Sequence, residues 1–336
     1  KEGQTLEEVK DLLLTQIEAI KKGEFPDWLI TAIINDLKLM EMKSYEDNDS
    51  RAAAFVNCFV NGIKWEDEVS KFDRYSKITK QDIMDFATKN LTDKNYVIVY
   101  KRTGVDKNII KVIKPKITPI KINRDDQSEF LKKIENNKVS EIEPVFLDFE
   151  KDLSKLKTKN GLEILYKENS ENKTFELTYV FNMGNNNDRK LNISLMYLNY
   201  LGTSKYTAEE LKQEFYKIGC SYKCTVADEN TYIDISGLSE NMDKALALFE
   251  SMMDDSKGDK AALDNLVSDV LKKRKDSKLN KQSILSTLVS YGKWGANGPS
   301  KNKLSETELN MLTPDELTLK IKELKTYQHY IKYYGS

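Results

Sequence analysis

The first hundred residues carry hydrophobic side chains at helical spacing. Thr5 and Glu8 stand at the spacing of a capping box, and the apolar residues behind them recur every three or four positions up to Gly23. The run 96–100 is aromatic and β-branched and predicts a strand. The same helical pattern predicts further helices after Pro26, over 51–59 as a mostly buried helix, and behind a cap formed by Thr79 and Asp82.

The segment 105–150 loses this periodicity. Pro115 and Pro119 lie close together, and the residue before a proline favours extended backbone. We therefore expect an extended linker that follows a surface, with a short helix near 128–135.

The second half alternates strand and helix patterns. Asn160 and Gly161 form the strongest two-residue hairpin signal, and 175–181 alternates apolar and polar positions. Further strands are expected at 221–226, 231–236 and 330–334. Helices are expected at 189–201 and 207–218, from Ser239 onward, as two more helices that end at about 291, and from Thr313 onward. A loop is expected at 292–302. This order predicts an α+β fold in which helices cover antiparallel sheets.

An internal repeat links the two halves. Thr79 and Thr313 each cap a helix that is followed by a tyrosine-rich run, 96–100 and 330–334, and then by glycine. An exposed tyrosine-rich strand can pair with an extended peptide, and packing in a core is the alternative role. We expect 1–104 to pack against the second half of the chain.

Composition removes several classes of function. Lys and Arg number 53 and Asp and Glu 54, so the net charge of -1 gives no electrostatic reason to expect nucleic-acid binding. No apolar run approaches the length of a membrane span. The only histidine is His329, which excludes any site that needs two histidines within this chain. The chain opens with Lys1, so we expect it to be a trimmed piece that a leader could precede.

The remaining chemistry-bearing residues favour structural roles. Cys58, Cys220 and Cys224 are expected to be small buried hydrophobes, because Cys220 and Cys224 would lie roughly 13 Å apart on one strand. His329 is interpreted as a structural histidine, with a metal-free hydrolase that uses it as an alternative. The basic run 272–275 is interpreted as a solvated helix face, and 184–188 as a loop.

An ordered series of motifs resembles the insulinase/pitrilysin-type zinc peptidases, or inverzincins. It consists of Leu-Gly-Thr-Ser-Lys-Tyr-Thr-Ala-Glu-Glu-Leu at 201–211, Ile-Gly-Cys-Ser-Tyr at 218–222 and Leu-Ser-Glu-Asn-Met-Asp-Lys-Ala-Leu at 238–246. The segments 21–25, 61–67 and 97–102 resemble the closing half of such a unit, and 117–125 resembles the connector between units.

The resemblance places the family's zinc-binding motif on residues that cannot bind zinc. The His-x-x-Glu-His helix precedes the Gly-Thr pair, and its functional positions fall on Ile193, Met196 and Tyr197. The third ligand, a glutamate, would fall within 263–269, where Leu263 and the acids Asp264 and Asp269 stand. The resemblance therefore implies no catalytic residue, no metal ligand and no cofactor in this chain.

The resemblance also implies a domain organisation and a function. Residues 1–104 would be the closing half of one unit, 105–150 a linker, and 151–336 the opening half of a second, zinc-less unit. The whole protein would be a zinc metalloendopeptidase. This inactive central portion would shape the substrate chamber and hold peptide, while zinc acts in a missing unit of the same polypeptide or of a paired subunit.

The alternative is a pseudo-enzyme or interaction subunit that binds a peptide or partner protein without hydrolysis. A His-x-x-Glu-His helix upstream or in a partner would distinguish the two. Both the cell envelope or periplasm and the cytoplasm of a bacterium are compatible with the sequence.

Overall fold

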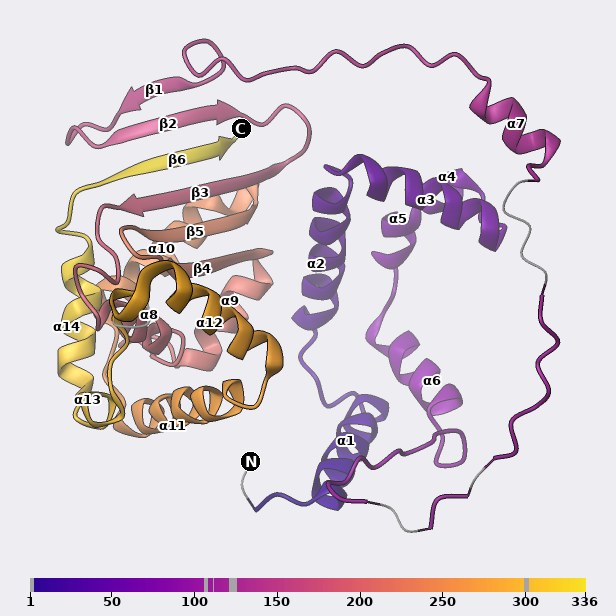
Figure 1. Cartoon of the computed structure of the whole chain (residues 1–336), viewed down its shortest axis with the longest axis horizontal. Helices are drawn as coiled ribbons and strands as arrows, with labels where there is room; N and C mark the ends of the chain where they lie inside the picture. Colours follow the sequence, from indigo (N-terminus) through magenta and orange to yellow (C-terminus); the bar gives the residue numbers. More distant parts are fainter. Residues whose placement is uncertain (1–2, 106–107, 111, 121–125, 299–301) are drawn as a thin grey trace.

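The second half of the chain folds around one six-stranded sheet with the strand order β1-β2-β6-β3-β5-β4 (Figure 1). The computed structural model describes residues 3–105, 108–110, 112–120, 126–298 and 302–336. The strands are β1 (Ser154–Lys157), β2 (Glu163–Glu168), β3 (Thr174–Phe181), β4 (Cys220–Val226), β5 (Thr231–Leu238) and β6 (His329–Gly335). The mixture of this sheet with helices confirms the α+β class.

Neighbouring strands are antiparallel except β2 and β6, which run parallel. The sequence patterns predict the antiparallel pairs β1–β2 and β4–β5, but neither the pairing of β3 with β5 and β6 nor the parallel pair. The hairpin between β1 and β2 forms at the predicted place, but residues 158–162 connect its last pair, Lys157 and Glu163, instead of the two-residue turn. Gly161 has φ +83°, a conformation that glycine adopts without a steric cost.

Alternation along the strands gives the sheet one apolar and one polar face. Phe175 and Leu177 of β3 are buried on the same face as Ile233 and Ile235 of β5 and Ile331 of β6. On the opposite face, the Thr178 hydroxyl donates a 2.7 Å hydrogen bond to Asp234. Such an alternation is expected of a sheet that packs helices on one side only.

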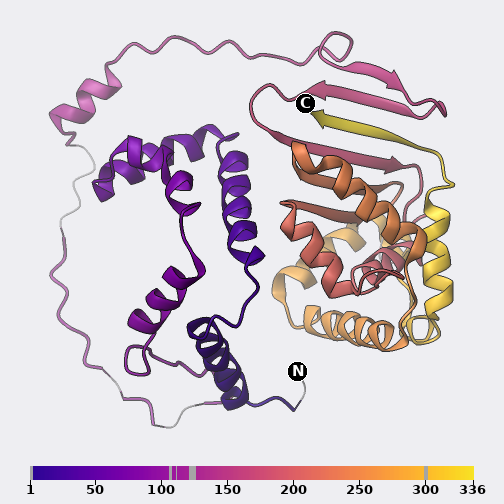
Figure 2. The same ribbon diagram turned by 180° about the vertical axis from the view of Figure 1, so that it is seen from behind.

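Helices cover the apolar face, and α10 crosses the side of the sheet that faces the viewer in Figure 2. The helices of this half are α8 (Leu191–Leu198), α9 (Ala208–Lys217), α10 (Met242–Asp255), α11 (Lys260–Ser277), α12 (Lys281–Trp294), α13 (Glu306–Asn310) and α14 (Pro314–Leu324). Capping boxes open α9 at Thr207 and α13 at Ser305, and Thr313 caps α14. The sequence analysis did not predict α13.

The first half is helical and touches the second half through α2. Its helices are α1 (Leu6–Lys21), α2 (Trp28–Ser44), α3 (Asn48–Asn61), α4 (Trp65–Val69), α5 (Lys71–Tyr75) and α6 (Lys80–Asn90). The Lys217 ammonium of α9 lies 4.9 Å from the ring centroid of Trp28, and Lys43 donates a 3.3 Å hydrogen bond to Ser236. The expectation that 1–104 packs against the second half thus holds for α2, whereas α1, α4 and α5 bury no residue.

Three local predictions are wrong. Residues 96–100 form no strand, because no described strand lies beside them to complete a ladder, and Val97 and Val99 are almost fully exposed. The helix predicted over 51–59 forms as α3, but only its Cys58 is buried. The buried Ser239 hydroxyl has no described hydrogen-bond partner, so it caps no helix; a short 3₁₀ turn, Ser239–Asn241, precedes α10 instead.

The tyrosine-rich run 330–334 does not form the peptide-binding edge considered from the sequence. It lies in β6, which is paired with β2 on one side and β3 on the other. Its backbone hydrogen-bonding groups are therefore used within the sheet. The outer strands of the sheet are β1 and β4.

The described part of the linker between the halves is largely extended, as predicted, but it does not follow a surface. Its side chains are exposed, with Ile113 and Val145 more than nine-tenths exposed, and Figure 1 shows it in a wide arc away from both halves. Its helix, α7 (Glu129–Glu135), is capped by the Ser128 hydroxyl at the predicted place. None of the helices in the described ranges is both long and apolar enough to cross a membrane.

The two cysteines of β4 should make the fold sensitive to alkali. Burial raises the pKa of the Cys220 thiol to about 11 and that of Cys224 to about 12, from an ordinary value of 9.0. The folded state thus holds both protons more tightly than the unfolded state. This stabilisation is complete below pH 9.0 and is lost as the pH rises towards the folded values. We expect the free energy of unfolding to fall by about 2 kcal/mol for each thiol when the pH rises from about 8 to about 10.5.

Urea unfolding at the two pH values measures this loss. The Cys220→Ala/Cys224→Ala variant serves as the control, since its stability should depend less on pH. An equal pH dependence in the two proteins would contradict the prediction.

Candidate functional site

The predicted zinc-motif positions all lie on α8, a short helix packed into the core. Ile193 and Tyr197 are buried, and Met196 is partly buried against the same core. Neither the side chain of Ile193 nor that of Met196 supplies a nitrogen or oxygen donor for Zn²⁺. At the positions where the resemblance places a metal centre, this helix therefore carries side chains that pack against the core.

The hydroxyl of Tyr197 is engaged by the backbone at the start of α11. It donates a 2.5 Å hydrogen bond to the carbonyl oxygen of Asp259 and accepts a 2.6 Å hydrogen bond from the Asp259 N–H. Burial raises the pKa of Tyr197, so the neutral phenol that makes both bonds is favoured. The side chain of Asp259 in turn caps α11 by accepting from the Ala262 N–H. Tyr197 thus joins α8 to the beginning of α11.

The segment considered for the third ligand does not complete a metal site either. Leu263 is buried in the core, Asp264 forms an ion pair with Lys260, and Asp269 lies in an open groove. Throughout the part of the chain that the structure describes, no three His, Cys, Asp or Glu side chains are grouped so that they could hold a metal ion. The residues present do not fit the zinc that the family resemblance implies.

The Gly-Thr pair behind α8 forms a tight turn. The Thr203 N–H donates a 2.7 Å hydrogen bond to the carbonyl oxygen of Tyr206, and the Thr203 hydroxyl accepts from the N–H of Tyr206 at 3.1 Å. The carbonyl of Gly202 accepts from the Lys257 N–H at 2.9 Å. The turn therefore holds α8, α9 and the segment before α11 together, which is a structural role.

A hollow of about 380 Å³ lies between α8, α11 and α12. Its apolar lining includes Ile193 and Met196 of α8 and Val270 of α11. Arg274 of α11 lines it as well, so Val270 and Arg274 share this hollow with Ile193 and Met196, whereas Leu263 of the segment 263–269 lies in the core. The zinc-motif positions 193 and 196 thus border a hollow of mixed lining, in which apolar side chains lie beside uncharged polar ones such as Asn192 and Ser290 and beside Arg274.

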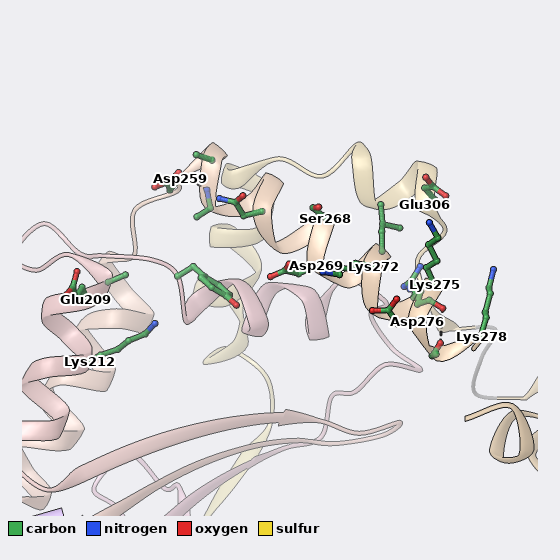
Figure 3. A pocket seen from close by; sticks show the side chains of 18 of the residues that line it. Glu209, Lys212, Asp259, Ser268, Asp269, Lys272, Lys275, Asp276, Lys278 and Glu306 are labelled. Atoms are coloured by element: carbon green, nitrogen blue, oxygen red, sulfur yellow. Dashed lines mark hydrogen bonds between the residues drawn. The ribbon is translucent and has the colours of Figure 1, made fainter. Parts of the chain in front are cut away.

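A larger groove of about 1960 Å³ follows α11 on the neighbouring side (Figure 3). Figure 3 shows its lining from Glu209 and Lys212 on α9 to Lys275 and Lys278 near the end of α11. Arg274 lines both this groove and the hollow. Basic and acidic side chains both line it, so it suits a chain that carries charges of both signs.

One ion pair fixes the far wall of the hollow. Arg189 donates bidentate hydrogen bonds of 2.9 and 2.8 Å to Glu308, and also donates to the carbonyl of Lys303. The Ser305 N–H and then Arg189 lower the pKa of Glu308 to about 2, which keeps this carboxylate ionised at neutral pH. The charge of Arg189 is therefore neutralised within the protein.

The other residues singled out from the sequence have structural surroundings. The Nδ1 atom of His329 lies 2.7 Å from the carbonyl of Tyr327, and its ring packs against Phe181 with centroids 4.7 Å apart. In the loop 184–188, Asp188 forms an ion pair with Lys320. The run 272–275 lies on the last turns of α11, where only Arg274 faces the hollow. Sequence reasoning missed this arginine because nothing in the run distinguishes it from its neighbours.

Residues 164–307 match the model of the insulinase family, peptidase family M16. No curated protein sequence matches the chain.

Two solved structures are among those with a similar fold. One is a peptidase M16 inactive domain from Pseudomonas fluorescens, with 17% identity, a TM-score of 0.46, and coverage of 55% of this chain and 46% of that chain. The other is the periplasmic protease PqqL from Escherichia coli, with 12% identity, a TM-score of 0.47, and coverage of 98% of this chain and 39% of that chain. This chain thus spans less than half the length of either structure. Residues 164–307, less than half of the chain, are thus similar to the insulinase family, peptidase family M16.

Proposed function

We propose that this chain is the non-catalytic central portion of a larger insulinase-type zinc peptidase. In this proposal it forms part of the chamber wall and holds peptide, while hydrolysis takes place at zinc in another unit. The observation that carries the proposal is the packing of α8. The side chains at its zinc-motif positions pack against the core, and Tyr197 is hydrogen-bonded to Asp259. The division into 1–104, 105–150 and 151–336 belongs to the same proposal.

The groove along α11 is the surface on which we place the peptide. Its size exceeds that of a typical small-molecule site, and its lining offers charges of both signs and free polar groups. Ser268 lies near the middle of the groove in Figure 3 and is exposed. A bulky side chain at this position would therefore obstruct an extended chain in the groove.

A binding and metal assay on the purified chain tests the proposal. After dialysis against zinc sulfate and removal of free metal, we expect far less than one zinc per chain and no cleavage of a fluorescein-labelled mixed-charge decapeptide. The same peptide should bind saturably in fluorescence anisotropy. Ser268→Trp should weaken this binding roughly tenfold, or by about 1.4 kcal/mol.

Lys273→Trp is the matched control, because Lys273 is exposed on the same helix but lines neither the groove nor the hollow. Stoichiometric zinc together with chelator-sensitive cleavage would overturn the proposal, and so would the absence of peptide binding. If no catalytic unit accompanies the chain in its native complex, the pseudo-enzyme interpretation replaces the chamber role.

A further inference from the structure

The groove along α11 and the hollow beside α8 meet at one cation. Arg274 and Thr287 each line both the groove and the hollow. Arg274 is partly buried and lies within the last turns of α11. A chain that follows the groove towards the C-terminal end of α11 therefore meets this guanidinium at the border of the hollow.

The guanidinium of Arg274 is held in place but keeps free donors. Its Nη1 donates a 2.6 Å hydrogen bond to the carbonyl oxygen of Leu304. A guanidinium has five N–H donors, so most of them remain for a ligand. Within the described ranges, no Asp or Glu side chain forms an ion pair with Arg274. Arg189 differs, because Glu308 occupies its guanidinium from two sides.

The surroundings of Arg274 combine apolar contact with a small excess of positive charge. Of the charged residues that line the hollow, three are positive and one is negative: Arg189, Arg274, Lys303 and Asp228. Once Arg189 is paired with Glu308, an excess of one positive charge remains. In the same hollow, Ile193, Met196 and Val270 supply apolar contact next to uncharged polar side chains such as Asn192 and Ser290. This pattern suits a carboxylate that is attached to an apolar group.

We propose that Arg274 binds a carboxylate of a peptide lying in the α11 groove, while a neighbouring apolar side chain of that peptide occupies the hollow. An arginine with a fixed, partly buried guanidinium recognises carboxylates through two parallel hydrogen bonds. The hollow of about 380 Å³ lies at the lower end of the range of ligand sites, which fits a side chain rather than a whole ligand. The inference rests on the proposed peptide-holding function and adds a determinant of specificity to it.

The test compares four labelled peptides on the full chain by fluorescence anisotropy. Each is a fluorescein-labelled octapeptide of Ala and Ser that ends in Leu, with a free or an amidated terminus and with Glu or Gln next to the last residue. Arg274→Gln should weaken the binding of carboxylate-bearing peptides about tenfold or more, and leave the amidated Gln peptide unchanged. Arg274→Lys should retain part of the affinity, because it keeps the charge but not the paired donors.

Lys273→Gln changes the net charge equally on the same helix, and is expected to change binding less than about twofold, as for an exposed charge. Loss of affinity on amidation assigns the terminal carboxylate, and loss on the Glu-to-Gln exchange assigns a side-chain carboxylate. Equal affinities of wild type and Arg274→Gln for the acidic peptides would overturn the inference, as would an equal effect of Lys273→Gln. Retained binding of the amidated Gln peptide would then leave the proposed function standing, whereas loss of all peptide binding would remove both.

Discussion

Replacing Tyr197 by Phe is expected to lower the free energy of unfolding by about 2 kcal/mol, and replacing it by Ala by about 4 kcal/mol. The phenol is fully buried, and its hydroxyl makes two hydrogen bonds to the backbone of Asp259. Phe removes the hydroxyl and leaves both the N–H and the carbonyl oxygen of Asp259 without this partner. Ala removes the ring as well and leaves a cavity between α8 and α11.

Urea unfolding followed by circular dichroism measures both variants. Tyr291→Phe is the control, because Tyr291 lies on α12 and its side chain is exposed, so its stability should stay within about 0.5 kcal/mol of wild type. A Tyr197→Phe variant as stable as this control would show that the hydrogen bonds of the hydroxyl to Asp259 do not stabilise the fold. The assignment of position 197 to packing rather than to ligand chemistry would then lose its main support.

The sequence predicted the local features of the fold well because their causes are local. A capping box lies within four residues of chain, so Thr5, Thr79 and Thr207 mark helix starts correctly without knowledge of the rest of the fold. The hairpin at Asn160 and Gly161 is local in the same sense. Predictions that required a distant partner fared differently. The run 96–100 has strand composition but no neighbouring strand, and Ser239 has a capping side chain but no partner for its hydroxyl.

For the candidate site too, the sequence predicted what depends on spacing along the chain but not what depends on packing between distant elements. The positions Ile193, Met196 and Tyr197 could be located from the ordered motifs around Gly202, because family resemblance preserves spacing along the chain. Which α11 residues share a hollow with Ile193 and Met196 depends on how the helices pack, and the structure brings Val270 and Arg274 there. Within the basic run 272–275, only the packing of α8, α11 and α12 separates the residue at the hollow from its solvated neighbours.

Gly202→Ala is expected to destabilise the protein by roughly 3 kcal/mol, although it adds only a methyl group. A Cβ at this position would lie 2.6 Å from the carbonyl oxygen of Tyr206 and 3.1 Å from the Cα atom of Thr207. Both atoms belong to the backbone of the turn and cannot move aside as the end of a side chain can. The displacement would disturb the hydrogen bond from the Thr203 N–H to Tyr206 and the contact with Lys257.

Gly292→Ala provides a control of the opposite sign. Gly292 lies within α12, a Cβ there meets no atom within 4 Å, and alanine favours the helix by roughly 0.5–1 kcal/mol. Thermal unfolding of the two variants should therefore shift in opposite directions. Equal stability of Gly202→Ala and wild type would mean that the turn accepts a side chain. The Gly-Thr pair would then need an explanation other than the close approach of backbone that joins α8, α9 and α11.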